Sequence, residues 1–153
     1  MIGMFAELNL IRVVLVDDDA EDREFFGEVI EELPFNVALT LYKNGQEFVD
    51  GMVSGGSPVP DLVFLDLNMP IKNGKDALKE LRAMEEFKTI PVIAIYSTST
   101  SEADQADTFL AGADAFISKP TDYRDLKHLI AKIFEIDWKG RSGDRKNFVI
   151  TPL

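Results

Sequence analysis

Short apolar segments and helical stripes of apolar residues alternate along most of the chain. The segments expected to be buried strands are residues 11–16, 37–42, 62–65, 92–96 and 115–118. Between and after them, apolar residues recur every three or four positions, which is typical of helices that bury one face. Five strands alternating with five helices predict an α/β fold with a doubly wound parallel sheet and right-handed crossovers.

The predicted elements are not equally apolar. Residues 62–65 form a continuous apolar run between Pro60 and Pro70, so this strand is expected to be buried on both faces. Residues 37–42 alternate and suit an edge strand. The fourth helix, over about 102–110, has few apolar positions and should bury little, whereas the last helix carries the cleanest stripe: Leu126, Leu129, Ile130, Ile133 and Phe134.

Composition narrows the function classes. The 153 residues fit one domain, and 27 acidic against 16 basic residues give a net charge of −11. This charge argues against nucleic acid or an anionic membrane as a direct partner, because phosphates bind clustered Lys and Arg. There is no cysteine, no apolar run of membrane-spanning length and no signal-peptide pattern, so a cytoplasmic protein is expected.

Carboxylates follow two of the predicted strands. Asp66 ends the most buried strand, and Asp17, Asp18 and Asp19 directly follow the first. Open parallel sheets place their chemistry at such carboxyl ends. Clustered carboxylates repel one another, and a divalent cation is the simplest way to keep them ionised. With only oxygen ligands in view, Mg²⁺ or Mn²⁺ is favoured over zinc.

These residues belong to a longer series of motifs. Asp17-Asp18-Asp19, Asp66 to Pro70 with Gly74, Ser97-Thr98, and Phe116 to Pro120 stand in order at successive strand ends. Over residues from about 11 to 135, the chain resembles the receiver domain of two-component response regulators. The resemblance implies a flavodoxin-like (βα)5 fold with strand order 2-1-3-4-5.

The resemblance also implies a function. Asp66 would accept a phosphoryl group from a sensor histidine kinase or a histidine phosphotransfer protein. The chain would not be an enzyme, beyond catalysing its own phosphorylation and dephosphorylation. Asp18 and Asp66 would bind the metal directly, Asp17 would contact it through water, and the backbone carbonyl of Asn68 would add a ligand.

The resemblance implies roles for several other residues. Lys119 would pair with Asp66 and then with the phosphoryl group, aimed inward by a cis Lys119–Pro120 bond. Ser97 would donate its hydroxyl to the phosphoryl group, although one extra residue after Pro91 leaves Tyr96 as the alternative at that register. The remaining expectations concern Thr98 as the small residue beside the phosphate, Asn68 and Ser99 as determinants of acyl phosphate lifetime, and Phe116 as an aromatic switch.

Three parts are expected: an N-terminal extension over 1–10, the receiver over 11–135, and a tail over 136–153 that is too short for an output domain. Trp138 and Phe148 to Ile150 are costly to leave in water, so the tail is expected to fold back or to contact another subunit, with disorder as the alternative. The surface over 102–134 is expected to bind a downstream protein or a second copy. His128 lies off the apolar stripe, so we expect it to be solvated and not a phosphodonor.

Three other functions compete with this interpretation. A haloacid-dehalogenase-type phosphohydrolase also uses an Asp nucleophile, but it needs a second Asp at the position that Asn68 occupies. A flavodoxin-like FMN binder would need a phosphate-binding loop after the first strand, where this chain is acidic. A docking module that works without phosphorylation is the third.

Overall fold

The computed structural model describes residues 5–55, 58–138 and 145–152. Its centre is one parallel sheet with the strand order β2-β1-β3-β4-β5-β6. The strands are β1 (Ile11–Val16), β2 (Val37–Tyr42), β3 (Leu62–Leu65), β4 (Val92–Ser97), β5 (Ala115–Ser118) and β6 (Val149–Ile150). The predicted order of the first five strands is confirmed, and a sixth strand from the tail extends the sheet beyond β5.

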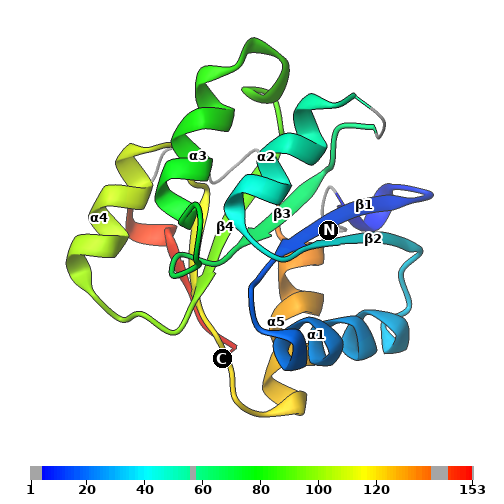
Figure 1. Cartoon of the computed structure of the whole chain (residues 1–153). Helices are drawn as coiled ribbons and strands as arrows, with labels where there is room; N and C mark the ends of the chain where they lie inside the picture. The colour runs from blue at the N-terminus through cyan, green and yellow to red at the C-terminus, as the bar shows by residue number, and fades with distance from the viewer. Residues whose placement is uncertain (1–4, 56–57, 139–144, 153) are drawn as a thin grey trace.

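The helices form a layer on each face of the sheet (Figure 1). They are α1 (Ala20–Glu32), α2 (Gly45–Val53), α3 (Gly74–Ala83), α4 (Glu102–Leu110) and α5 (Tyr123–Glu135), with short 3-10 turns at Phe5–Glu7, Glu85–Phe87 and Arg145–Asn147. Helices α1 and α5 cover one face around what we call the α1–α5 core, which includes Leu15, Phe64 and Leu129. Helices α2, α3 and α4 cover the other face around the α2–α4 core, which includes Val16, Leu65 and Phe116.

Polar residues set where the helices begin. Each of the five helices has a side-chain oxygen at its N-cap that accepts a backbone N–H from the first turn: Asp19, Asn44, Asn73, Ser101 and Asp122. These contacts satisfy amides that have no partner inside the helix. The caps place the start of α1 directly after β1 and thereby fix the loop that carries Asp17 and Asp18.

The relative burial of the elements follows the sequence pattern. Strands β3 and β4 are buried throughout, while β2 is partly exposed at the sheet edge. Helix α5 buries its whole apolar stripe, and His128 lies on the exposed side of this helix. The only buried residue of α4 is Thr108. In the part of the chain that the structure describes, no helix is long and apolar enough to cross a membrane.

The tail folds back where the structure describes it. Trp138 is buried in the α1–α5 core, and its ring N–H donates to the Ile133 carbonyl oxygen. Phe148 and Ile150 are buried as well. Residues 139–144 and 153 of the predicted tail, and residues 1–4 of the predicted N-terminal extension, lie outside the described residues.

Candidate functional site

Strand pairing brings the acidic residues together. In the β1–β3 register Val16 lies beside Leu65, so Asp17 and Asp66 follow at the same edge of the sheet. Carboxylate oxygens of Asp17, Asp18 and Asp66 lie within 4.8 Å of one another. Asp17 and Asp66 are buried, whereas Asp18 is exposed. The predicted meeting of the two acidic strand ends therefore occurs in the folded chain.

Lys119 extends from the end of β5 into this cluster. Its Nζ lies 2.8 Å from Asp17 Oδ2, 3.0 Å from Asp22 Oδ2 and 3.3 Å from Asp66 Oδ2. The expected cis Lys119–Pro120 bond is wrong, because no peptide bond among the described residues is cis. The trans form is the lower-energy isomer, and the attraction of three carboxylates directs the ammonium inward without a cis bond.

Burial and mutual repulsion govern the charges of the cluster. The pKa of Asp66 is raised to about 6, chiefly by burial; Lys119 lowers it and the neighbouring Asp17 raises it, and both effects are included in that value. Burial likewise raises the pKa of Asp17. Burial opposes the charge of Lys119, but its contacts with Asp17 and Asp66 outweigh that effect and raise the pKa of Lys119. One ammonium thus compensates two buried carboxylates only in part.

The cluster fits a divalent cation. Asp17 Oδ1 accepts the backbone N–H of Asp19, but Asp17 Oδ2 is a buried oxygen without a hydrogen-bond donor. Lys119 Nζ is close to Asp17 Oδ2, so we regard that contact as an ion pair whose geometry is not that of a hydrogen bond. A buried anionic oxygen without a donor, beside two further carboxylates, is a ligand set that hard cations prefer.

Hydrogen bonds and a close glycine contact hold the loop between β3 and α3 near Asp66. Asp66 Oδ1 accepts the backbone N–H of Leu67, and the Gly74 N–H donates to the Leu67 carbonyl oxygen. A Cβ on Gly74 would lie 2.1 Å from the Asp66 carbonyl oxygen, so only glycine allows this approach. Ile71 in the same loop has a φ of 70°, a strained value for a β-branched residue. Asn68 is exposed and lines the pocket that contains Asp66.

The residues at the end of β4 differ in their position relative to the acidic pocket. Tyr96 is buried against Phe26 and Phe64 in the α1–α5 core, with Lys119 Nζ 5.5 Å from its ring centre. Ser97 is buried, its hydroxyl oxygen accepts the Ser99 N–H, and its carbonyl oxygen accepts the Lys119 N–H. Thr98 lines the acidic pocket.

The remaining sequence-predicted positions are Ser99, in the loop before α4, and Phe116, in β5. Ser99 donates its hydroxyl to Asp104 Oδ2 on α4. Phe116 is fully buried in the α2–α4 core, beside Phe148. The ring of the proposed switch is therefore already inside the protein.

Asp22 is a site residue that the sequence-based prediction missed. It lies in the first turn of α1, lines the acidic pocket and forms an ion pair with Lys119. The sequence carried no clear signal for it, because Asp22 is one of several acidic residues in α1 and Asp18 precedes the N-cap Asp19, where helical spacing does not apply.

Comparison with known proteins identifies the family. Residues 13–131 match the family model described as the response regulator receiver domain. The chemotaxis protein CheY-3 of Vibrio cholerae is 33% identical over 133 residues, which are 82% of this chain and 92% of that protein.

Solved structures give the same result. The Mn²⁺-bound form of the response regulator Rcp1 superposes with a TM-score of 0.73 at 25% identity, covering 80% of this chain and 91% of that chain. The phosphorylated cyanobacterial phytochrome response regulator RcpA gives a TM-score of 0.72 at 25% identity, covering 80% and 90%.

Proposed function

The chain belongs to the response regulator receiver domain family, and we propose that Asp66 is its phosphoryl acceptor. Receiver domains are phosphoacceptor signalling modules, and the donor we propose is a phosphohistidine of a sensor histidine kinase or a histidine phosphotransfer protein. The observation that carries the assignment is the position of Asp66 between Lys119, 3.3 Å away, and the carboxylates of Asp17 and Asp18.

In the proposed reaction a carboxylate oxygen of Asp66 attacks phosphorus and forms an acyl phosphate. The phosphorus–nitrogen bond to the donor histidine breaks, and its electron pair remains on the histidine nitrogen. Phosphoryl transfer depends on alignment and charge compensation. Lys119, which already contacts the Asp66 carboxylate, would then pair with a phosphoryl oxygen.

We assign the metal to Asp17, Asp18 and Asp66, with the backbone carbonyl of Asn68 as a further ligand. Mg²⁺ is the cation we propose, with Mn²⁺ as its substitute, since the similar protein Rcp1 has been solved in a Mn²⁺-bound form. When bound, the cation would neutralise charge on the transferring phosphoryl group. The buried Asp17 Oδ2 without a donor supports a direct role for Asp17, whereas the family resemblance implies a water-mediated one.

Ser97 is the hydroxyl we propose as the phosphoryl contact. Tyr96, the alternative at this register, has its ring in the core against Phe26 and Phe64, which favours Ser97. To reach a phosphoryl group, the Ser97 hydroxyl must release the Ser99 N–H that it now accepts. Ser99 and Asn68 stay our candidates for setting the lifetime of the acyl phosphate.

We propose that the chain signals through a change in the conformation of the surface formed by residues 102–134, which we call the output face. Phosphorylation draws in Ser97 and Lys119 and favours the buried position of Phe116, so that it changes the populations of existing conformations. A downstream protein or a second copy would bind there. We propose no catalytic activity beyond the chain's own phosphorylation and dephosphorylation. The cytoplasmic location stays a prediction. The division into an extension, a receiver domain and a tail at residues 10 and 135 also stays a prediction.

The family match gives no support to the haloacid-dehalogenase-type alternative. The pocket contains Asn68 two residues after Asp66, where such a phosphohydrolase needs an acid. A docking module that works without phosphorylation has the same fold, and only an assay separates it from a phosphoacceptor.

The decisive measurement is the intact mass after incubation with acetyl phosphate and Mg²⁺. We expect the wild type to gain the mass of one phosphoryl group and Asp66→Asn to gain none. Asp61→Asn is the matched control, because Asp61 lies just before β3, at its other end, and its carboxylate accepts the Arg12 N–H there. Asp17→Asn with Asp18→Asn should label far more slowly. An unlabelled wild type would favour the docking module, and equal labelling of Asp66→Asn would refute the assignment.

A further inference from the structure

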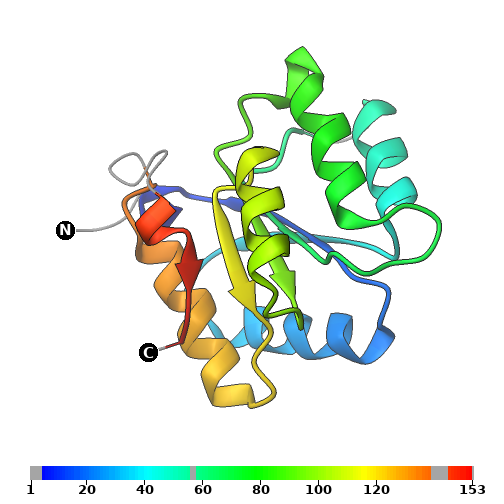
Figure 2. The same ribbon diagram turned by 90° about the vertical axis from the view of Figure 1, so that its left-hand side faces the viewer.

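The described end of the tail, residues 145–152, lies along the sheet edge that β5 would otherwise leave open. We call it the tail segment. Its strand β6 pairs parallel with β5, placing Val149 beside Phe116 and Ile150 beside Ile117. The Phe116 N–H donates to the Phe148 carbonyl oxygen at 2.8 Å. Figure 2 shows β6 in red beside the yellow β5, with the end of the chain next to α5.

Aromatic packing joins the tail segment to α4 and β5. Phe148 is 2% exposed, and its ring meets Phe109 of α4 edge-on, with the ring centres 5.2 Å apart. The Phe148 and Phe116 ring centres are 6.3 Å apart. The guanidinium group of Arg145 lies over the Phe109 ring, with its central carbon 5.4 Å from the ring centre. Phe109 is a partly buried residue of α4 that packs against the α2–α4 core, and Phe148 and Arg145 add contacts to its ring.

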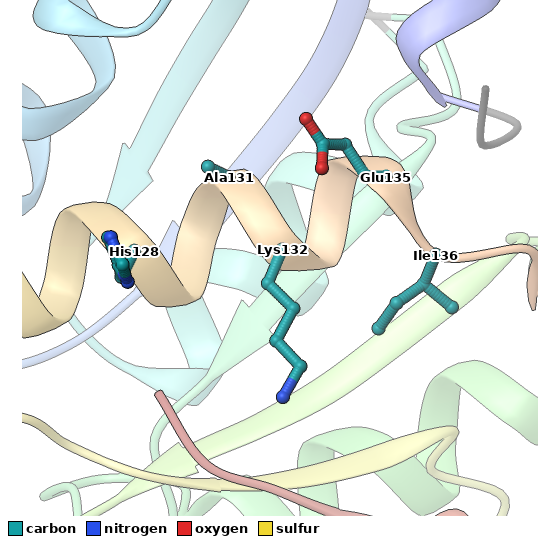
Figure 3. A pocket seen from close by; sticks show the side chains of 5 residues that line it. All are labelled: His128, Ala131, Lys132, Glu135 and Ile136. Carbon is teal, nitrogen blue, oxygen red and sulfur yellow. The ribbon is translucent and has the colours of Figure 1, made fainter. Parts of the chain in front are cut away.

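The same segment also contacts the α5 side. Ile150 is buried in the α1–α5 core, and Lys132 of α5 donates to the Thr151 carbonyl oxygen at 3.2 Å. Figure 3 shows Lys132 pointing away from α5 in the groove lined by His128, Ala131, Lys132, Glu135 and Ile136. The tail segment thus touches α4, β5 and α5, the three elements of the output face, and it lies beyond the family match, which ends at residue 131.

We propose that the tail segment is an intramolecular partner of the output face that holds Phe116 in its buried position before phosphorylation. The Phe116 and Phe148 rings are both buried and neighbour each other, so a docked tail adds apolar contact that favours the buried position of Phe116. Tail docking and Phe116 burial are therefore one coupled equilibrium.

This coupling has a direction. It rests on the proposed function, in which the acyl phosphate favours buried Phe116. A docked tail then favours the conformation that phosphorylation needs, and phosphorylation in turn strengthens tail docking, because linkage is reciprocal. A partner of the output face meets a surface that already includes β6, with Val149 on its exposed side.

The test uses the full chain and the neighbouring substitutions Phe148→Ala and Val149→Ala. Phe148 is buried, whereas Val149 is 42% exposed, so the second variant controls for the change to alanine in the same strand. Without phosphodonor, hydrogen exchange of residues 115–118 should be faster in Phe148→Ala than in wild type and unchanged in Val149→Ala. Because labelling needs the conformation with buried Phe116, its rate with acetyl phosphate and Mg²⁺ should fall with the population of that conformation, by about fivefold or more in Phe148→Ala.

A milder variant covers the case in which Phe148→Ala does not fold. Arg145→Gln removes the stacking over Phe109 from an exposed residue, and we expect an intermediate loss of protection and of labelling rate. Unchanged exchange at 115–118 in both variants would refute the docking role. Faster exchange with an unchanged labelling rate would refute the coupling.

The design separates this proposal from the proposed function. A wild type that takes no phosphoryl group refutes the assignment of Asp66, while the exchange data still decide whether the tail segment docks on β5. Protection at 115–118 that falls on dilution, together with a dimer by light scattering, would show that the tail of a second copy occupies the face and would overturn the intramolecular version.

Discussion

Leu15 and Asp17 stand two residues apart at the end of β1, and both are 0% exposed. Leu15 lies in the α1–α5 core, whereas Asp17 lies in the acidic pocket with a buried oxygen that lacks a hydrogen-bond donor. Burying a leucine side chain stabilises a protein by about 1.5–3 kcal/mol. Burying a carboxylate is unfavourable unless charge and hydrogen bonds compensate it fully.

The difference shows how one strand serves stability and function. The apolar part of β1 is held by packing on both faces, which fixes the backbone at its carboxyl end. That fixed backbone keeps Asp17 and Asp66 close together against their repulsion, with Lys119 as partial compensation. The core thus stabilises a pocket that destabilises the metal-free protein, and the two regions should respond in opposite directions to substitution.

The largest effect should come from the core. Leu129→Ala on α5 removes a fully buried side chain from the α1–α5 core and should lower the free energy of unfolding by about 2–5 kcal/mol. Urea denaturation measures this loss. The exposed neighbour His128 is the control, and His128→Ala should change stability by less than about 0.5 kcal/mol. A loss below about 1 kcal/mol in Leu129→Ala would contradict the assignment of this core as the main source of stability.

In the pocket, replacing Asp66 by Asn should raise stability in the absence of metal, by a smaller amount than the core substitution lowers it. This gain should shrink as the pH falls. The folded-state pKa of Asp66 is raised to about 6 from an ordinary value of 3.8, so between these values the folded protein binds more protons than the unfolded chain. Without metal, stability should therefore increase as pH falls through 6. Between pH 7 and pH 5 the wild type should gain about 1 kcal/mol relative to Asp66→Asn.

The comparison with Asp66→Asn is needed because other carboxylates act in the opposite direction. The ion pair and hydrogen bond of Asp104 with Lys75 and Ser99 lower the pKa of Asp104, so its contribution is lost as pH falls. Denaturation in the presence of a chelator, at several pH values for both proteins, isolates the Asp66 contribution. A difference between the two proteins that does not vary with pH would show that Asp66 is ionised over the whole range.

The smallest effect should come from the loop beside the pocket. Ile71 has a positive φ and is 81% exposed, so Ile71→Gly relieves strain and loses little packing. The relief is partly offset by the greater freedom of glycine in the unfolded chain, and a net gain of about 0.5 kcal/mol is expected. Leu110, 82% exposed at the end of α4, is the matched control, and Leu110→Gly should lose about 0.5 kcal/mol. Thermal denaturation measures both changes. Melting temperatures that shift in the same direction in the two variants would contradict strain at Ile71.

Much of the fold could be predicted from local patterns. Strands β1, β2, β3 and β5 and helix α4 have the predicted bounds, because apolar runs, turn residues and N-caps are properties of neighbouring residues. The meeting of Asp17, Asp18 and Asp66 was also predictable, since carboxyl ends of neighbouring parallel strands share one edge. The identity of the neighbouring strands came from the family resemblance, because strand order leaves no mark in a single segment.

The sequence by itself thus determined the elements, the acidic strand ends and the family. Only the tertiary structure decided the pairing of Lys119 with Asp22, the inward position of Tyr96 and the attachment of the tail as β6. Each of these depends on residues far apart in the chain. A two-residue strand such as β6 has too few positions for a periodic pattern, and it forms because the open edge of β5 and the apolar surface around Phe109 and Phe116 are there to receive it.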